Sequence, residues 1–223
     1  MRRRSPPRTS LAFAFAFVCS SWACRGAEEP EASAPPVPAS PTARPIEVRP
    51  SHDWQVVYEP SMTPEQRERL EKAKAAKSKL ASRLMEELSS AVSEGNFARG
   101  VEVCRDTAPK VAREVSTDLD IEIGRTSFKV RNPKNRPEGW RARMVEARPT
   151  DDVVLAGPGG AVGYFSPIRL AEPCVACHGT NEQMASPVKE ILASAYPEDE
   201  ATGFAPGDLR GWFWVEVSGP AAN

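Results

Sequence analysis

Histidine is scarce in this sequence: its 223 residues include 2 histidines, His52 and His178, together with 5 cysteines. Outside residues 174–178 these side chains form no cluster, so the second group of Cys or His ligands that a structural zinc site needs is missing. No internal repeat is visible, and the apolar run Leu11–Val18 is too short to span a bilayer as a stable anchor. The sequence therefore argues against a zinc-stabilised module and against a repeat array.

The N-terminus has the layout of an export signal. Four arginines within the first eight residues precede the run Leu11–Val18, which ends near small residues. Ser21–Cys24 resembles a lipoprotein cleavage site at which Cys24 would be acylated, although Trp22 is unusual there. We expect residues 1–23 to be a signal peptide and the mature protein to be periplasmic, tethered through Cys24. Ordinary signal cleavage with a soluble product stays open.

The next segment, residues 24–60, is predicted to be a disordered tether, because its Pro, Ala, Ser and Glu content cannot bury enough apolar surface. A folded domain is expected over residues 61–218 and a short tail over 219–223. Loss of the signal removes 4 arginines from 29 basic residues and no acidic residue, which leaves 25 against 30 and a net charge of -5. This charge argues against nucleic acid or anionic lipid as a partner, so membrane contact is expected only through the lipid anchor.

The strongest motif is Cys174-Val175-Ala176-Cys177-His178. C-x-x-C-H is the pattern for covalent attachment of haem: two thiols on one turn bond the macrocycle, and the adjoining imidazole ligates the iron. A thioredoxin-like redox pair and half of a zinc site are the alternatives, but His rarely follows a redox pair and no second zinc cluster exists. The motif predicts one covalent haem c, held by Cys174 and Cys177 with His178 as the proximal iron ligand.

Apolar spacing predicts helices in the first half of the folded domain. Thr63, Pro64 and Gln66 form a capping-box pattern, and leucines at helical spacing follow up to Gly95. A second helix is expected from Phe97 to Val115, with Cys104 facing inward on its apolar stripe and a kink or a new helix start near Pro109.

Beyond Asp118 the pattern changes to strands. β-forming residues occur around Ile121, 153–155, 162–165 and 212–217, and a Gly-rich turn at 157–160 predicts a hairpin. Short helices are expected at 137–148 and 187–196. Helices followed by strands make the expected fold class α+β.

A family resemblance runs through most of the folded domain. The sequence resembles the single-haem c-type domains with a PAS-like fold, the Tll-like haem domains, and the resemblance extends in order from Glu65 to Val217. It rests on the following stretches: Ile123–Pro133 with Asn135, Pro137 and Trp140; Tyr164 and Ser166–Ile168; Cys174–Gly179; Tyr196, Pro197, Asp199, Ala201 and Gly203; and Gly207–Gly211. The resemblance implies a small antiparallel sheet flanked by helices.

Cys104 is the cysteine left over once Cys19 leaves with the signal, Cys24 is lipidated and two cysteines hold haem. The resemblance implies that this Cys, which is followed shortly by Ala108 and Pro109, is the distal iron ligand. Met144 and Met184 remain alternatives, whereas His52 at the edge of the tether is a poor candidate. A small buried apolar role is the other interpretation of Cys104.

Three basic residues are candidates for the haem propionates. Arg125, Lys129 and Arg131 alternate along an expected strand and would then point to one side. The alternative is a solvated face of an edge strand.

Three functions remain. A His/Cys-ligated iron has no open position, which favours a sensor of redox state or of a diatomic gas such as CO or NO, working with an unidentified redox or signalling protein. A periplasmic electron-transfer cytochrome is the alternative. An enzyme is the weakest candidate, since no distal histidine is available for acid–base chemistry.

Overall fold

The computed structural model describes residues 53–93 and 95–220. The expected signal peptide, Cys24, His52 and most of the expected tether lie outside the described residues. The last residues of the expected tether, residues 24–60, are structured: Gln55–Val57 form strand β1 and Glu59–Ser61 form a 3-10 turn. No helix in the described part of the chain combines the length and the apolarity needed to cross a membrane.

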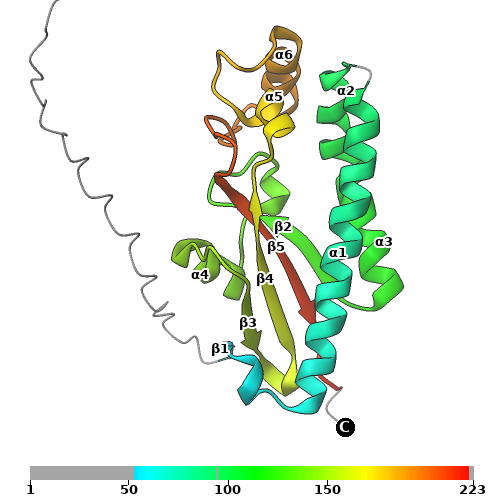
Figure 1. The fold of residues 1–223 in the computed structure, drawn as a ribbon, viewed down its shortest axis with the longest axis vertical. Coiled ribbons are helices and arrows are strands. Elements are labelled where there is room, and N and C mark those ends of the chain that lie inside the picture. The colour runs from blue at the N-terminus through cyan, green and yellow to red at the C-terminus, as the bar shows by residue number, and fades with distance from the viewer. Residues whose placement is uncertain (1–52, 94, 221–223) are drawn as a thin grey trace, which may run out of the picture. The chain divides into compact units, whose positions relative to one another are not determined.

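A five-stranded antiparallel sheet forms the centre of the fold (Figure 1). Its order is β1-β3-β4-β5-β2, and the other strands are β2 (Glu122–Thr126), β3 (Val153–Ala156), β4 (Val162–Arg169) and β5 (Leu209–Val217). β3 and β4 form the hairpin expected at the Gly-rich turn, which is a 3-10 turn at Pro158–Gly160. β5 inserts between β4 and β2, so the C-terminal strand joins the two halves of the sheet.

Helices cover both faces of the sheet. α1 (Pro64–Ser93) and α3 (Ala108–Leu119) bury Leu80 and Val111 against one face, whereas α4 (Trp140–Ala147) packs on Phe165 and Trp212 of the other. The same strands contribute to both apolar clusters, because successive side chains of a strand point to opposite faces of the sheet. The expected α+β class and the sheet flanked by helices are confirmed.

The expected capping box begins α1. The Thr63 backbone N–H donates to Gln66 Oε1 at 2.9 Å, and the Gln66 N–H donates to Thr63 Oγ1 at 3.3 Å. These reciprocal bonds satisfy two N–H groups that the first turn of a helix leaves without partners.

The helix expected from Phe97 to Val115 is divided. α2 (Phe97–Glu102) is followed by a π-helical turn, η2 (Val103–Thr107), before α3 begins. Pro109 supplies the physical reason, since proline donates no hydrogen bond and its ring crowds the carbonyl four residues earlier. Cys104 lies on this turn, is half-buried and belongs to none of the apolar clusters, so it does not occupy the position on a buried apolar stripe that was expected for it.

The strand expected to carry three basic residues is also shorter than predicted. β2 ends at Thr126, so Lys129 and Arg131 lie in the following loop and do not alternate with Arg125. The chain turns there because Ser127 Oγ donates to the Arg210 carbonyl and accepts from the Lys129 N–H.

The Cys174–His178 motif lies in a separate helical part beside α2. The turn Glu172–Cys174 leads into α5 (Val175–His178), which is followed by α6 (Ser186–Ala195), and both helices contact α2 (Figure 1).

Candidate functional site

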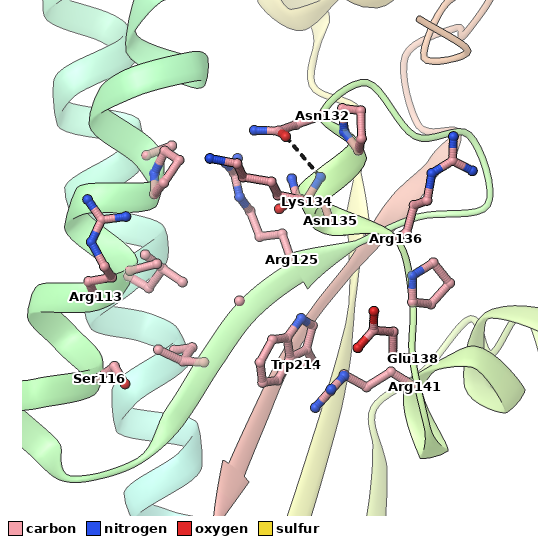
Figure 2. Close-up of a pocket in the computed structure, with 18 residues that line it drawn as sticks. Arg113, Ser116, Arg125, Asn132, Lys134, Asn135, Arg136, Glu138, Arg141 and Trp214 are labelled. Atoms are coloured by element: carbon pink, nitrogen blue, oxygen red, sulfur yellow. Dashed lines mark hydrogen bonds between the residues drawn. The ribbon is translucent and has the colours of Figure 1, made fainter. Parts of the chain in front are cut away.

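A cleft of about 430 Å³ lies along the β2 edge of the sheet, between α3 and residues 132–138 (Figure 2). Arg125 lines this cleft, but Cys104, Cys174, Cys177 and His178 do not. The motif predicted from the sequence is therefore not in the cleft, and its site is formed by the surroundings of α5.

Two small apolar clusters hold α5. Cys177 packs against the α6 cluster, defined by Val101, Met184, Val188, Leu192 and Tyr196. Cys174 packs against the Phe204 cluster, defined by Leu170, Ala201 and Phe204. Both thiols are free and half-buried. The fold thus fixes the backbone of the motif while leaving both sulfur atoms unbonded.

His178 is oriented through one ring nitrogen. Its Nδ1 lies 2.8 Å from the Ala201 carbonyl oxygen, a contact that requires Nδ1 to carry the proton. Arg210 Nε lies 3.3 Å from the same nitrogen, but a protonated Nδ1 cannot accept from it, so the shorter bond to Ala201 decides the tautomer. The lone pair is then on Nε2, which is the arrangement of metal-ligating histidines.

The surroundings also keep the imidazole neutral. Desolvation, followed by the positive charges of Arg131 and Arg210, holds the pKa of His178 well below its usual value. A neutral ring is the form that ligates iron, because a protonated nitrogen has no lone pair to donate.

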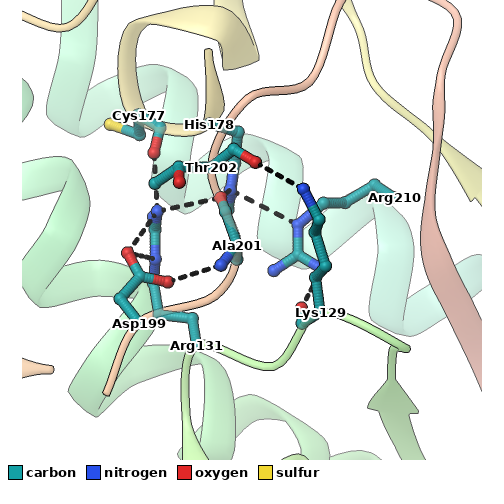
Figure 3. Close-up of polar contacts among 8 residues, drawn as sticks. All are labelled: Lys129, Arg131, Cys177, His178, Asp199, Ala201, Thr202 and Arg210. Atoms are coloured by element: carbon teal, nitrogen blue, oxygen red, sulfur yellow. Dashed lines mark hydrogen bonds and ion pairs between the residues drawn. The ribbon is translucent and has the colours of Figure 1, made fainter. Parts of the chain in front are cut away.

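A buried ion pair between Arg131 and Asp199 lies next to the motif (Figure 3). Arg131 and Asp199 are joined at 2.9 Å, with side-chain exposures of 8% and 10%. Arg131 Nη2 also donates to the carbonyls of Cys177 at 2.7 Å and Ala201 at 3.2 Å. Asp199 Oδ1 accepts from the Ala201 N–H at 2.8 Å. One arginine therefore links α5 to the backbone group that orients His178.

Cys104 lies on the π-helical turn η2. α2 packs on α5 and α6, and η2 continues directly from α2. Burial raises the pKa of the Cys177 thiol to about 11; nearby Arg131 opposes this rise, and Cys104 and Cys174 add to it. Cys104 likewise contributes to the raised pKa of Tyr196, after burial as the main cause. Cys104 is thus close enough to Cys177 and Tyr196 to influence their pKa values.

The two methionine alternatives differ in position. Met144 is a residue of α4 and is fully buried in the cluster of Phe165 and Trp212. Met184 belongs to the α6 cluster, against which Cys177 packs. The fold thus brings Met184, but not Met144, to the part of the molecule that contains the motif.

The predicted propionate residues do not act as a group. Arg131 is committed to Asp199 and two carbonyls, and Lys129 Nζ donates to the Thr202 carbonyl at 3.0 Å. Arg125 makes no ion pair or side-chain hydrogen bond within residues 53–93 and 95–220, and its charge contributes to the lowered pKa of His178. Of the three, Arg125 has the most donors left for a carboxylate.

Sequence reasoning missed Asp199 and Arg210. Arg210 Nη1 donates to Ser127 Oγ at 2.9 Å and to the Lys129 carbonyl at 3.1 Å, and its guanidinium lies 5.4 Å from the Phe204 ring. Desolvation, with Arg131 and Arg125, lowers the pKa of Arg210 to about 10. Both residues belong to the stretches that carry the family resemblance, and this was the available signal.

The donor set fits a c-type haem. It combines two free thiols one turn apart with a neutral imidazole whose Nε2 is available, and a third free thiol, Cys104, lies on η2, which continues from α2. Among the described residues, no three His, Cys, Asp or Glu side chains are placed to hold one metal ion, so the ligand set of a zinc site is not assembled there.

Two comparisons with known proteins give a match. The model of the Tll0287-like family matches residues 58–218. Among solved structures, the chain is similar to the cyanobacterial heme-protein Tll0287, with a TM-score of 0.52, 21% sequence identity, and coverage of 70% of this chain and 96% of that one. No curated protein matches the chain. The structural match supports the fold, and the family match covers all of the site.

Proposed function

The chain belongs to the Tll0287-like family, and on that basis we propose that it is a c-type haem protein. Cys174 and Cys177 form the thioether bonds, and His178 is the proximal iron ligand. The observation that carries this proposal is the bond from His178 Nδ1–H to the Ala201 carbonyl, which leaves Nε2 free beside two unbonded thiols. When bound, haem supplies one-electron redox chemistry and a coordination position for diatomic molecules.

Cys104 is proposed as the distal ligand. It is the third thiol of the described residues, and it lies on the π-helical turn that continues from α2, which contacts α5. Single π-helical turns are frequent at functional sites. Arg125 is the proposed partner of a propionate, since it makes no ion pair with a carboxylate of residues 53–93 and 95–220. Arg131 and Lys129 instead position the loops around the motif.

The proposed physiological role is a sensor of redox state or of a diatomic gas. Cys104 lies outside the apolar core clusters, so a change between its bound and free forms disturbs η2 without opening the core. η2 lies between α2, which contacts the motif, and α3, which packs on β2. A movement of η2 caused by ligand exchange at Cys104 is therefore passed through α3 to the sheet. A partner protein bound to the sheet or to α3 can respond to that movement.

Electron transfer is the second candidate. All residues from Cys174 to His178 are half-buried, so a group bonded there lies near the surface, as electron exchange between proteins requires. Absorption spectra of the oxidised and reduced protein with and without CO separate the two roles. A CO adduct after reduction supports sensing, whereas a reduced spectrum unchanged by CO supports a carrier.

Mass spectrometry of the exported protein tests attachment and targeting together. We expect a haem adduct on the Cys174–His178 peptide, an N-terminus at Cys24 and a lipid on that residue. An unmodified Cys174–His178 peptide would sink the haem proposal, while an unlipidated N-terminus would overturn only the anchor.

Distal ligation is tested with Cys104→Ala. We expect the thiolate features of the ferric spectrum to disappear, with Met184→Leu as the matched control because it changes the competing ligand. An unchanged ferric spectrum in Cys104→Ala, or a loss of those features in Met184→Leu, contradicts the assignment.

A further inference from the structure

The cleft at the β2 edge has walls of mixed chemistry (Figure 2). Trp214 of β5 lies across Gly124 of β2, where an added Cβ would come within 2.7 Å of the indole. Gly124 thus lets an aromatic surface reach the cleft, and Arg141 extends that surface by stacking on Trp214 at 4.2 Å. Pro109, Pro133 and Pro137 add rigid apolar walls.

The charged side chains of the cleft are almost all positive. Five cations line it: Arg113, Arg125, Lys134, Arg136 and Arg141. Glu138 is the one carboxylate in the lining. This excess of positive charge contrasts with the full sequence, which carries 29 basic and 30 acidic residues.

Two of the five cations have distant carboxylate partners. Arg136 lies 3.6 Å from Glu198, and Arg141 lies 3.7 Å from Glu216. Arg113, Arg125 and Lys134 form no ion pair within residues 53–93 and 95–220. Three positive charges in a shared concave site repel one another, and an anion between them would remove that repulsion.

We propose that this cleft binds a small organic anion that carries at least two carboxylate or phosphate groups. Arg113 and Lys134 pair with the anionic groups, since guanidinium and ammonium groups recognise both chemistries, whereas Arg125 remains the proposed partner of a haem propionate. Trp214 and the prolines pack on the carbon skeleton. The volume of about 430 Å³ lies within the usual range of small-molecule sites.

Cys104, Cys174, Cys177 and His178 do not line the cleft, so it is distinct from the proposed thioether and iron ligands, although its lining includes Arg125, the proposed propionate partner. The cleft and the proposed haem site are nevertheless neighbours in the chain. Ala108, which lines the cleft, directly follows the turn η2 that carries Cys104, and Asn132 directly follows Arg131. An anion bound there contacts both α3 and β2, the elements through which the state of Cys104 is proposed to reach the sheet.

Isothermal titration calorimetry of the full-length, haem-loaded protein tests the proposal. The probes are benzene-1,3,5-tricarboxylate, citrate and pyrophosphate at low ionic strength, with benzyl alcohol as the neutral control. We expect at least one anion to bind, with an affinity that decreases as salt is added. Arg113→Glu and Lys134→Glu are each expected to weaken binding by about fivefold to tenfold.

Lys110→Glu is the matched control. Lys110 is exposed on the same helix as Arg113 but does not line the cleft, so the same charge change should leave the affinity within about twofold. No binding of any anion overturns the proposal, as does an equal loss in all three variants. Binding that appears only in the haem-free Cys174→Ser/Cys177→Ser protein assigns the cations to the haem carboxylates and also overturns it, while the haem proposal stands.

Discussion

Among single residues, Asp199 and Arg131 support the motif most directly. Both are nearly buried, and Arg131 bonds the carbonyls of Cys177 and Ala201 as well as the Asp199 carboxylate. A buried charge that loses its partner retains the full desolvation cost, so the pair is sensitive to the removal of either side chain.

Asp199→Ala is expected to reduce the free energy of unfolding by about 3–5 kcal/mol, because Arg131 is then buried without a counter-charge. Urea denaturation measures this change. The adjacent Glu198→Ala is the control: Glu198 is exposed and lies 3.6 Å from Arg136, so its loss should cost about 0–1 kcal/mol. Equal effects of the two substitutions would show that the buried pair has no special role.

Cys104 shows the limit of predicting the burial of a side chain from helical spacing. Counting the cysteines identified it as the one without an assigned role, but the apolar periodicity placed it in the core. In the structure Cys104 lies on the π-helical turn Val103–Thr107, half-buried and outside the apolar clusters, where it contributes to the raised pKa of Cys177.

At the level of secondary-structure elements, α1 follows its local sequence closely. Its start is fixed by the capping box of Thr63 and Gln66, and the predicted Leu70, Leu80 and Leu84 are buried, whereas Leu88 near its end is only partly buried. Such a helix is encoded locally, since both signals lie within a few residues of each other.

Thr63→Ala is expected to lower the free energy of unfolding by about 1 kcal/mol, because the Gln66 N–H loses its acceptor. Thermal or urea denaturation followed by circular dichroism provides the measurement. Thr117→Ala, the same side-chain change at an exposed position inside α3, should be neutral or slightly stabilising. A comparable loss from both substitutions would argue against the cap.

For the whole molecule, the apolar core is unevenly distributed. The clusters on the two faces of the sheet draw on α1, α3, α4 and the central strands, whereas α5 and α6 are held by the smaller α6 and Phe204 clusters. Segments with fewer buried apolar contacts open at lower free energy than the main core.

Hydrogen exchange is therefore expected to be faster over residues 170–205 than over β4 and β5. Replacing Cys174 and Cys177 by Ser should increase exchange in 170–205 by more than tenfold while the sheet stays protected, because the proposed covalent haem no longer links that segment to its neighbours. Exchange mass spectrometry of the two proteins makes the comparison. Uniform loss of protection in both regions would mean that the segment and the sheet unfold as one unit.

The sequence by itself determined the fold class, the limits of α1 and the spacing of the Cys174–His178 motif, because each of these depends on residues close together in the chain. The tertiary structure alone decided which residues surround that motif. Asp199, Arg131 and Arg210 come from different loops and strands, and their contacts with Cys177, Ala201 and His178 join residues up to 70 positions apart. Local periodicity carries no information on such pairs, since they form only when the sheet and the loops around it pack together.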